Sequence, residues 1–484
     1  MSWLEELESK LRENEEEQSL IYYEGLKHRK LDSEQLEAKA TEWREMLLDP
    51  DLWDRVEGEL KSETHPVTCR KLELLRKWII MTRINYNEEL LELRHSIEKK
   101  VNTFRPIFKG KELGYAELRE IVRKDPDRNN RSEAYMAVKP LLESIRGEAI
   151  ESIKLANALT RKEGFSTYAD LVLHMEGFTE NELLELFAKL KHYTNPAWQQ
   201  FIELTRNNVT TDIQPYDLTY MVYKLTYPPD HRFPRDKLLD SLKRTVEAFD
   251  LDLNALPVKI EFCDIPYGGV CVVLKHHQDV RLLMNPREGY TYYGVLFHEF
   301  GHALHSLYSP DSILLRDEAP FSEGMADIWA GLLEERSWLD KFTDMTSSEV
   351  EQFLITRPID RAYAFRSTIR DFVFELQLYK NPDAKFEAVW VAVSEEYLYL
   401  KDDTGIWPYF PFTYPLYIKN YVLSRLIKEV TYKFMHDKYG EIVGNPHVVR
   451  FLIEHYYQPG NLVHWRDKIK SSTGSDPLTS LLYF

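Results

Sequence analysis

The chain has few cysteines and no apolar run long enough to span a membrane. Cys69, Cys263 and Cys271 are its three cysteines among 484 residues. This odd, widely spaced set provides no disulfide framework and indicates a reducing compartment. Charges interrupt even apolar stretches such as RKWIIMTRI, whereas a membrane-spanning helix needs roughly 18 apolar residues. We therefore expect a cytoplasmic protein that does not enter the membrane.

Excess positive charge and an apolar leader are also absent. The chain has 62 Lys and Arg against 79 Asp and Glu, for a net charge of −17. Because neutralising phosphates requires clustered basic side chains, this scattered, acidic balance excludes a nucleic-acid partner and disfavours anionic membrane surfaces. The first residues, MSWLEELESKLRENEEEQ, contain no apolar run, so we expect no signal or transit peptide.

The composition that is present is that of a globular, mostly helical protein. Hydrophobic residues make up 43% of the chain and charged residues 29%. From Trp3 to about Asp250, apolar residues recur at three- and four-residue spacing, which predicts successive helices. Capping boxes mark two helix starts and a weaker signal marks a third, at Thr179 with Glu182, Thr346 with Glu349, and Asp32 with Gln35.

The pattern changes once, at about residues 257–285. The runs VKIEF, VCVVL and VRLLM are short and β-branched, and the polar stretch 275–279 separates the last two. They predict a small antiparallel sheet with a hairpin turn. The fold class is therefore mainly α with one small sheet. We expect an N-terminal helical region at 1–120 and a catalytic region at 121–484, or one continuous domain.

The motif His298-Glu299-Phe300-Gly301-His302 follows the predicted sheet directly. Residues four apart share one face of a helix, so His298 and His302 can reach a single tetrahedral zinc ion. Glu299 then lies beside a water on the metal and can act as general base. The stretch Tyr292 to Leu307 has the apolar residues that a packed helix needs.

A catalytic zinc site needs a third protein ligand, and two carboxylates compete for this place. We favour Glu323, which lies in a predicted helix one turn before Asp327, so that Asp327 can orient a ligand histidine. Glu318 is the alternative ligand. We expect one zinc ion per chain. His305 is expected to pack beside the site without binding the metal.

Two further histidines have no predicted role. His276 and His277 lie in the predicted hairpin turn, where we expect a solvated loop.

Several motifs occur together in this chain: HEFGHALH, a glutamate on a second helix, the segment from Cys263 to Asn285, and Gln458-Pro459-Gly460 followed by Gly474-Ser475-Asp476-Pro477. Together they resemble the thimet oligopeptidase and oligoendopeptidase F family of zinc peptidases. FSEGMAD is also similar to the third-ligand segment of angiotensin-converting enzyme, a related gluzincin. Softer similarity extends through 360–379 and 407–421, so that roughly residues 140–484 are covered.

This resemblance implies a neurolysin-like fold, a two-lobed helical ellipsoid with a deep central channel. It also implies that His298, His302 and Glu323 bind zinc and that Glu299 activates the water. Because such a channel admits only short unstructured peptides, the implied substrates are oligopeptides. The resemblance makes no prediction of oligomeric state.

One departure from the family concerns the group that stabilises the oxyanion. Family members carry a histidine shortly before a tyrosine cluster, but WPYFPFTYPLYIKNYV contains none. Tyrosine hydroxyls can donate to an oxyanion instead. We take Tyr421 as the first candidate and Tyr417 as the second, with Tyr409 and Tyr414 also available.

The predicted function is that of a zinc-dependent oligopeptidase that cuts internal bonds of short peptides. One alternative is a zinc carboxypeptidase of similar fold, with Lys419 or Arg370 holding the substrate carboxylate. A second is a catalytically weak, zinc-containing peptide-binding protein. An extended substrate could also pair with the strand Val270–Leu274 or Val280–Met284.

Overall fold

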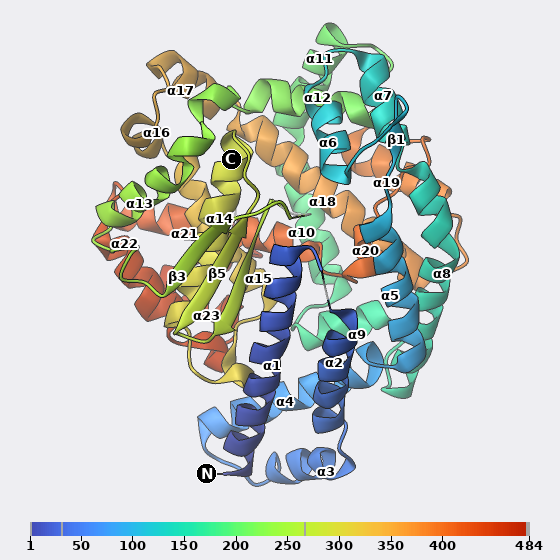
Figure 1. Ribbon diagram of the computed structural model, residues 1–484, viewed down its shortest axis with the longest axis vertical. Helices are drawn as coiled ribbons and strands as arrows, with labels where there is room; N and C mark the ends of the chain where they lie inside the picture. The colour runs from blue at the N-terminus through green and yellow to red at the C-terminus, as the bar shows by residue number, and fades with distance from the viewer. Residues whose placement is uncertain (1, 31, 266–267, 481–484) are drawn as a thin grey trace. The chain divides into compact units, whose positions relative to one another are not determined.

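The computed structural model describes residues 2–30, 32–265 and 268–480, which are mostly helical (Figure 1). Contacts within the chain group it into two units. Unit 1 contains Met1–Arg83, Pro228–Glu351 and Leu423–Leu482, and unit 2 contains Ile84–Tyr227 and Gln352–Val422. The expected division near residue 120 stays a prediction. The mainly α fold class is confirmed.

Unit 1 contains the small sheet. Its strands are β3 (Val258–Phe262), β4 (Gly269–Lys275) and β5 (Asp279–Met284), in the order β3-β5-β4. The β4–β5 hairpin is antiparallel as predicted, whereas β3 pairs with β5 in parallel. The sheet is therefore mixed rather than wholly antiparallel. The reason is its strand order, because β5 returns between β3 and β4 and runs in the direction of β3.

The first helix of unit 1 packs against this sheet. Helix α1 (Trp3–His28) places Tyr23 in one apolar cluster with Val272 of β4 and Leu283 of β5. Figure 1 shows α1, in blue, beside the yellow-green strands. The other helices of this unit, or partly within it, are α2 (Ser33–Leu47), α3 (Pro50–Glu59), α4 (Pro66–Asn85), α13 (Leu238–Ala248), α14 (Tyr290–Tyr308), α15 (Ala319–Gly331), α16 (Arg336–Phe342), α17 (Ser347–Ile355), α21 (Lys419–Tyr439), α22 (Pro446–Phe451) and α23 (Trp465–Thr473).

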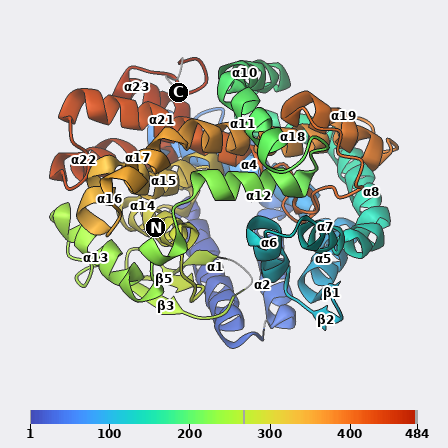
Figure 2. The ribbon, with the colours of Figure 1, turned by 90° about the horizontal axis from the view of Figure 1, so that it is seen from above.

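Unit 2 is built around a helical core to which Trp198, Phe201, Met221 and Ala362 contribute. Figure 2 shows two of its helices, α6 and α7, next to each other. Its helices are α5 (Glu88–Thr103), α6 (Tyr115–Lys124), α7 (Arg128–Met136), α8 (Lys139–Lys162), α9 (Tyr168–Met175), α10 (Glu180–Tyr193), α11 (Asn195–Asn208), α12 (Pro215–Thr226), α18 (Arg357–Lys380), α19 (Phe386–Leu398) and α20 (Phe410–Thr413). A short ladder of β1 (Ile107–Phe108) and β2 (Lys111–Glu112), which the sequence did not predict, joins them.

The predicted helix starts form as expected. Thr179 Oγ1 accepts a hydrogen bond from the backbone of Glu182, whose carboxylate accepts one from the Thr179 backbone. Thr346 and Glu349 form the same reciprocal pair. Among the described residues, no helix is both long and apolar enough to cross a membrane.

Candidate metal centre

A glycine lies where helix α14 meets the backbone of helix α15. A Cβ atom on Gly301 would lie 2.7 Å from Cα of Ala326 and 2.9 Å from the carbonyl oxygen of Met325. No other residue fits there without separating the helices. Helix α14 starts after Gly289, whose φ of +104° favours glycine. Its apolar side buries residues that include Leu296, Phe300 and Leu304, and this packing fixes the opposite, polar face.

The polar side chains of the two helices converge at one point. Nε2 of His298 lies 3.3 Å from Oε2 of Glu323, and Nε2 of His302 lies 3.8 Å from the same oxygen. One ligand atom from each of these three residues lies within 4.8 Å of the other two. The structure thus brings together the three residues that the sequence named as zinc ligands.

This arrangement fits a small divalent cation. Zn–N and Zn–O bonds of about 2.0–2.1 Å in a tetrahedron place neighbouring ligand atoms about 3.3 Å apart. The observed distances of 3.3 and 3.8 Å are close to this value. Two imidazoles and one carboxylate are also a donor set that zinc prefers.

Asp327 and Ser424 hold His298 in the orientation that a ligand needs. Nδ1 of His298 lies 3.2 Å from Oδ1 of Asp327, so its N–H donates to the carboxylate and Nε2 is directed to Glu323. Oγ of Ser424 in turn donates to Oδ2 of Asp327 at 2.6 Å. Chains of this kind, from carboxylate to histidine to metal, fix the tautomer and raise the basicity of the ligand.

The protonation of these groups shows that the site attracts positive charge. Although burial opposes it, hydrogen bonds to Asp327 and Glu323 raise the pKa of His298 to about 10. Burial, with the charge of His298, lowers the pKa of His302 to about 3, so that its imidazole is neutral. Despite burial, the bond to His298 lowers the pKa of Asp327 to about 2. A cation between these ligands would replace the proton that His298 holds.

Glu299 lies one step round the helix from the two histidines. Burial, supported by the charge of Glu323, raises the pKa of its carboxyl group to about 7. The charge of His298 and a hydrogen bond from the backbone of Cys271 in β4 act in the opposite direction. A carboxylate with a pKa near neutrality suits a general base, because it can accept and later release a proton.

The alternative ligand Glu318 is engaged elsewhere. It is the N-cap residue of α15, and its carboxylate lies 3.6 Å from Nζ of Lys77 and 3.4 Å from Nε2 of His464. His305 likewise turns away from the ligands, with Nε2 3.0 Å from Oδ2 of the buried Asp317. Its expected packing role is consistent with this contact.

The tyrosines proposed for the oxyanion belong to unit 2. Tyr421 is in the first turn of α21, and its ring centroid is 5.7 Å from that of Tyr417. Their role stays a prediction. The carboxylate-binding candidates are paired with acidic neighbours, because Lys419 Nζ lies 2.8 Å from Oε2 of Glu176, and Arg370 Nη2 lies 2.8 Å from Oδ1 of Asp371.

The structure corrects the expectation for one hairpin histidine. His277 lies in the β4–β5 turn with φ +61°. His276 is buried rather than solvated, because the hairpin tip packs against the carbonyls of Ser309 and Pro310. That packing partner lies more than 30 residues away, so no local pattern reveals it.

Other contacts of the site were also not predicted. Each of three groups contacts a residue of the site: Ser424 contacts Asp327, and the backbone of Cys271 contacts Glu299. The third is Ser322, whose Oγ lies 3.2 Å from Nδ1 of His302. Ser322 alone carried a local signal, because it precedes Glu323 in the predicted helix.

The fold is shared with peptidases of known structure. An M32 carboxypeptidase from Deinococcus radiodurans R1 aligns with a TM-score of 0.68 and 14% identity, over 98% of this chain and 96% of that one. PZ peptidase A with an inhibitor aligns at 0.73 and 16%, over 95% and 86%. A putative oligoendopeptidase F aligns at 0.67 and 17%, over 91% and 81%. The mainly α peptidase fold that the sequence resemblance implied is therefore confirmed.

Comparison by sequence adds no further relatives. No family model matches the chain, and no curated protein matches it in sequence.

Proposed function

We propose that the protein is a zinc-dependent peptidase that hydrolyses internal bonds of short, unstructured peptides. The convergence of His298, His302 and Glu323 carries this proposal, because these side chains form a zinc-type donor set within a fold shared with peptidases. His298 and His302 would bind through Nε2, and Glu323 through its carboxylate.

The ion supplies Lewis-acid chemistry when bound, because it polarises a carbonyl and lowers the pKa of a water molecule to about 7. Glu299 takes the proton of the attacking water and then delivers it to the leaving amine. Burial raises the pKa of its carboxyl group above the ordinary range, which suits a group that must both accept and release a proton. Asp327 keeps His298 in its binding orientation throughout.

Tyr421, or Tyr417 in second place, donates a hydrogen bond to the oxyanion in this proposal. A phenol is suited to this role because it donates without a change of protonation. Replacing the active tyrosine with phenylalanine is expected to lower kcat by about 10²–10³ and to leave KM nearly unchanged.

Strand β4 is the proposed partner of an extended substrate. It lies at the edge of the sheet, whereas β5 is the central strand and cannot accept another chain. The backbone N–H of Cys271 donates to Glu299 and so points away from β5. Alternate residues of a strand point their N–H groups to the same side, so the N–H of Val273 also faces the outer edge of β4. Val273→Pro is expected to raise KM, with Val273→Ala as control. An unchanged KM would exclude this strand.

Cleavage of single C-terminal residues is the second candidate activity. One solved structure that aligns with this chain over almost the full length of both proteins is a carboxypeptidase. Such an enzyme needs a cation for the substrate carboxylate, but Lys419 is 1% exposed and paired with Glu176. We therefore rank internal cleavage first.

The test compares the zinc-loaded protein with its Glu299→Gln variant on unstructured peptides of graded length. Mass spectrometry of the products is expected to show internal cuts, slowed about 10²–10⁴-fold in the variant at equal zinc content. Stepwise loss of C-terminal residues would assign a carboxypeptidase instead. Binding of peptides without cleavage by either protein would indicate a peptide-binding protein.

A further inference from the structure

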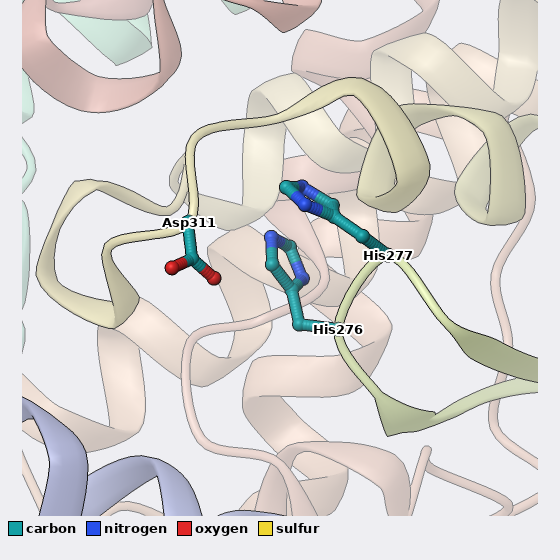
Figure 3. A group of neighbouring side chains, drawn as sticks. All are labelled: His276, His277 and Asp311. Atoms are coloured by element: carbon teal, nitrogen blue, oxygen red, sulfur yellow. The ribbon is translucent and has the colours of Figure 1, made fainter.

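A second group of metal-ligand side chains lies outside the α14–α15 site. His276 and His277 lie at the tip of the β4–β5 hairpin, and Asp311 lies in the segment between α14 and the short helix Ile313–Leu315. One ring nitrogen of each histidine and one carboxylate oxygen of Asp311 lie within 4.8 Å of one another. Figure 3 shows the three side chains meeting between the hairpin and the facing segment.

Backbone carbonyls hold the two rings in place. Nε2 of His277 lies 2.7 Å from the carbonyl oxygen of Ser309, and Nε2 of His276 lies 3.1 Å from that of Pro310. The ring centroids are 4.0 Å apart. A bond from one ring nitrogen to a backbone carbonyl is typical of metal-binding histidines, because it limits ring rotation and leaves the other nitrogen, here Nδ1, to bind the metal. The residue after these two carbonyls is Asp311.

The charge around the group is compatible with a cation. Burial lowers the pKa of His276 to about 4, and the nearby His277 and Arg316 contribute, so its imidazole is neutral. Arg316 is itself paired with Glu15. Arg12 pairs with Asp311, with Nη1 2.8 Å from Oδ1, and its other nitrogen donates to the Asp311 carbonyl. The second carboxylate oxygen of Asp311 retains lone pairs for a metal.

We propose that His276, His277 and Asp311 form a second metal site, for a divalent ion of the zinc type. Two imidazoles and one carboxylate favour zinc, cobalt or nickel over magnesium or calcium, which prefer oxygen ligands. Because His277 and Asp311 are exposed, solvent completes the coordination. A bound ion links the hairpin tip to the segment that follows α14, so it stabilises unit 1.

The experiment counts the metal ions bound to each chain. Full-length protein is dialysed against zinc, and the bound zinc is measured by inductively coupled plasma mass spectrometry. Wild type is expected to bind two ions. His298→Ala/His302→Ala, which removes the first site, is expected to bind one. This count does not depend on catalysis, so failure of the proposed peptidase function and failure of the second site give different results.

The ligand variants then identify the second site. His277→Asn removes the imidazole and suits the left-handed backbone, since asparagine tolerates positive φ. His277→Asn is combined with His298→Ala/His302→Ala and is expected to remove one ion. If the variant without the first site does not fold, His277→Asn is tested alone. Asp311→Asn is expected to weaken binding at least about tenfold. The proposal is wrong if wild type binds one ion and His298→Ala/His302→Ala binds none. It is also wrong if His277→Asn and Asp311→Asn both retain the second ion.

Arg12 offers a test in the opposite direction. Arg12→Gln removes a positive charge from Asp311 and is expected to tighten zinc binding at this site about tenfold. Cobalt absorption and the zinc-dependent rise in melting temperature provide independent readouts. If the residues only packed the hairpin, Arg12→Gln would not strengthen binding, and that result would contradict the proposal.

Discussion

Each unit buries a carboxylate, but the partners of the two carboxylates differ. In unit 2, Asp217 is fully buried and accepts hydrogen bonds from Arg131 at 2.9 Å, from Arg128 at 3.0 Å and from the backbone of Gln214 at 3.0 Å. In unit 1, Glu323 is 7% exposed and faces the imidazoles of His298 and His302.

The partner determines what a buried carboxylate can do. Guanidinium groups are always charged and occupy both oxygens of Asp217, so no capacity for a metal ion is left. Imidazoles can give up their protons and present lone pairs to the same point as Glu323. The first arrangement joins α7 to α12, and the second is suited to holding a cation.

The largest effect is expected at the structural carboxylate. Asp217→Asn leaves two arginines without a buried counter-charge, so we expect the free energy of unfolding to fall by about 3–5 kcal/mol. Denaturant unfolding measures this, and zinc binding to the folded fraction should be unchanged. Loss of zinc affinity in the folded fraction would show that the two carboxylates are not separate in function.

Glu323→Gln is expected to act on metal rather than on folding. Loss of this ligand should weaken zinc binding at the α14–α15 site by more than about 100-fold. The loss should exceed the one caused by removing a residue that only hydrogen-bonds to a ligand. Glu318→Gln is the matched control, because Glu318 pairs with Lys77 and His464 instead. Equilibrium dialysis distinguishes them. Equal losses in both variants would reopen the choice of third ligand.

Asp327→Asn is expected to have an intermediate effect. It keeps the shape of the side chain but removes the charge that orients His298, so zinc affinity should fall by about 10–100-fold. A chelator competition titration gives the constant. Affinity equal to that of wild type would mean that Asp327 serves only in packing.

Ser424→Ala is expected to have the smallest effect. It removes the hydroxyl that donates to Asp327, and it acts on the metal only through two intervening side chains. We expect zinc affinity to fall less than about tenfold, because the lost hydrogen bond, worth about 1.5–3 kcal/mol to Asp327 itself, reaches the metal only in part. If Ser424→Ala exceeds Asp327→Asn in the same titration, the proposed order of contacts is incorrect.

The parts of the site that follow local rules could be predicted from sequence. His298 and His302 share a helix face by spacing alone, and the helical pattern around Glu323 favoured it over Glu318. Ser424 lies 97 residues beyond Asp327, and its contact depends on how α21 packs. The parallel pairing of β3 with β5 and the burial of His276 likewise depend on distant segments, which periodicity does not describe.

Gly301 has a consequence for moving this site into another protein. In the motif His-Glu-x-x-His, the position before the second histidine is open to any residue, but here a Cβ atom would meet the backbone of α15 at 2.7 Å. Transplanting the ligands alone would therefore be insufficient. A recipient scaffold would need the same clearance between its helices, and a library that varies this position should recover mainly glycine.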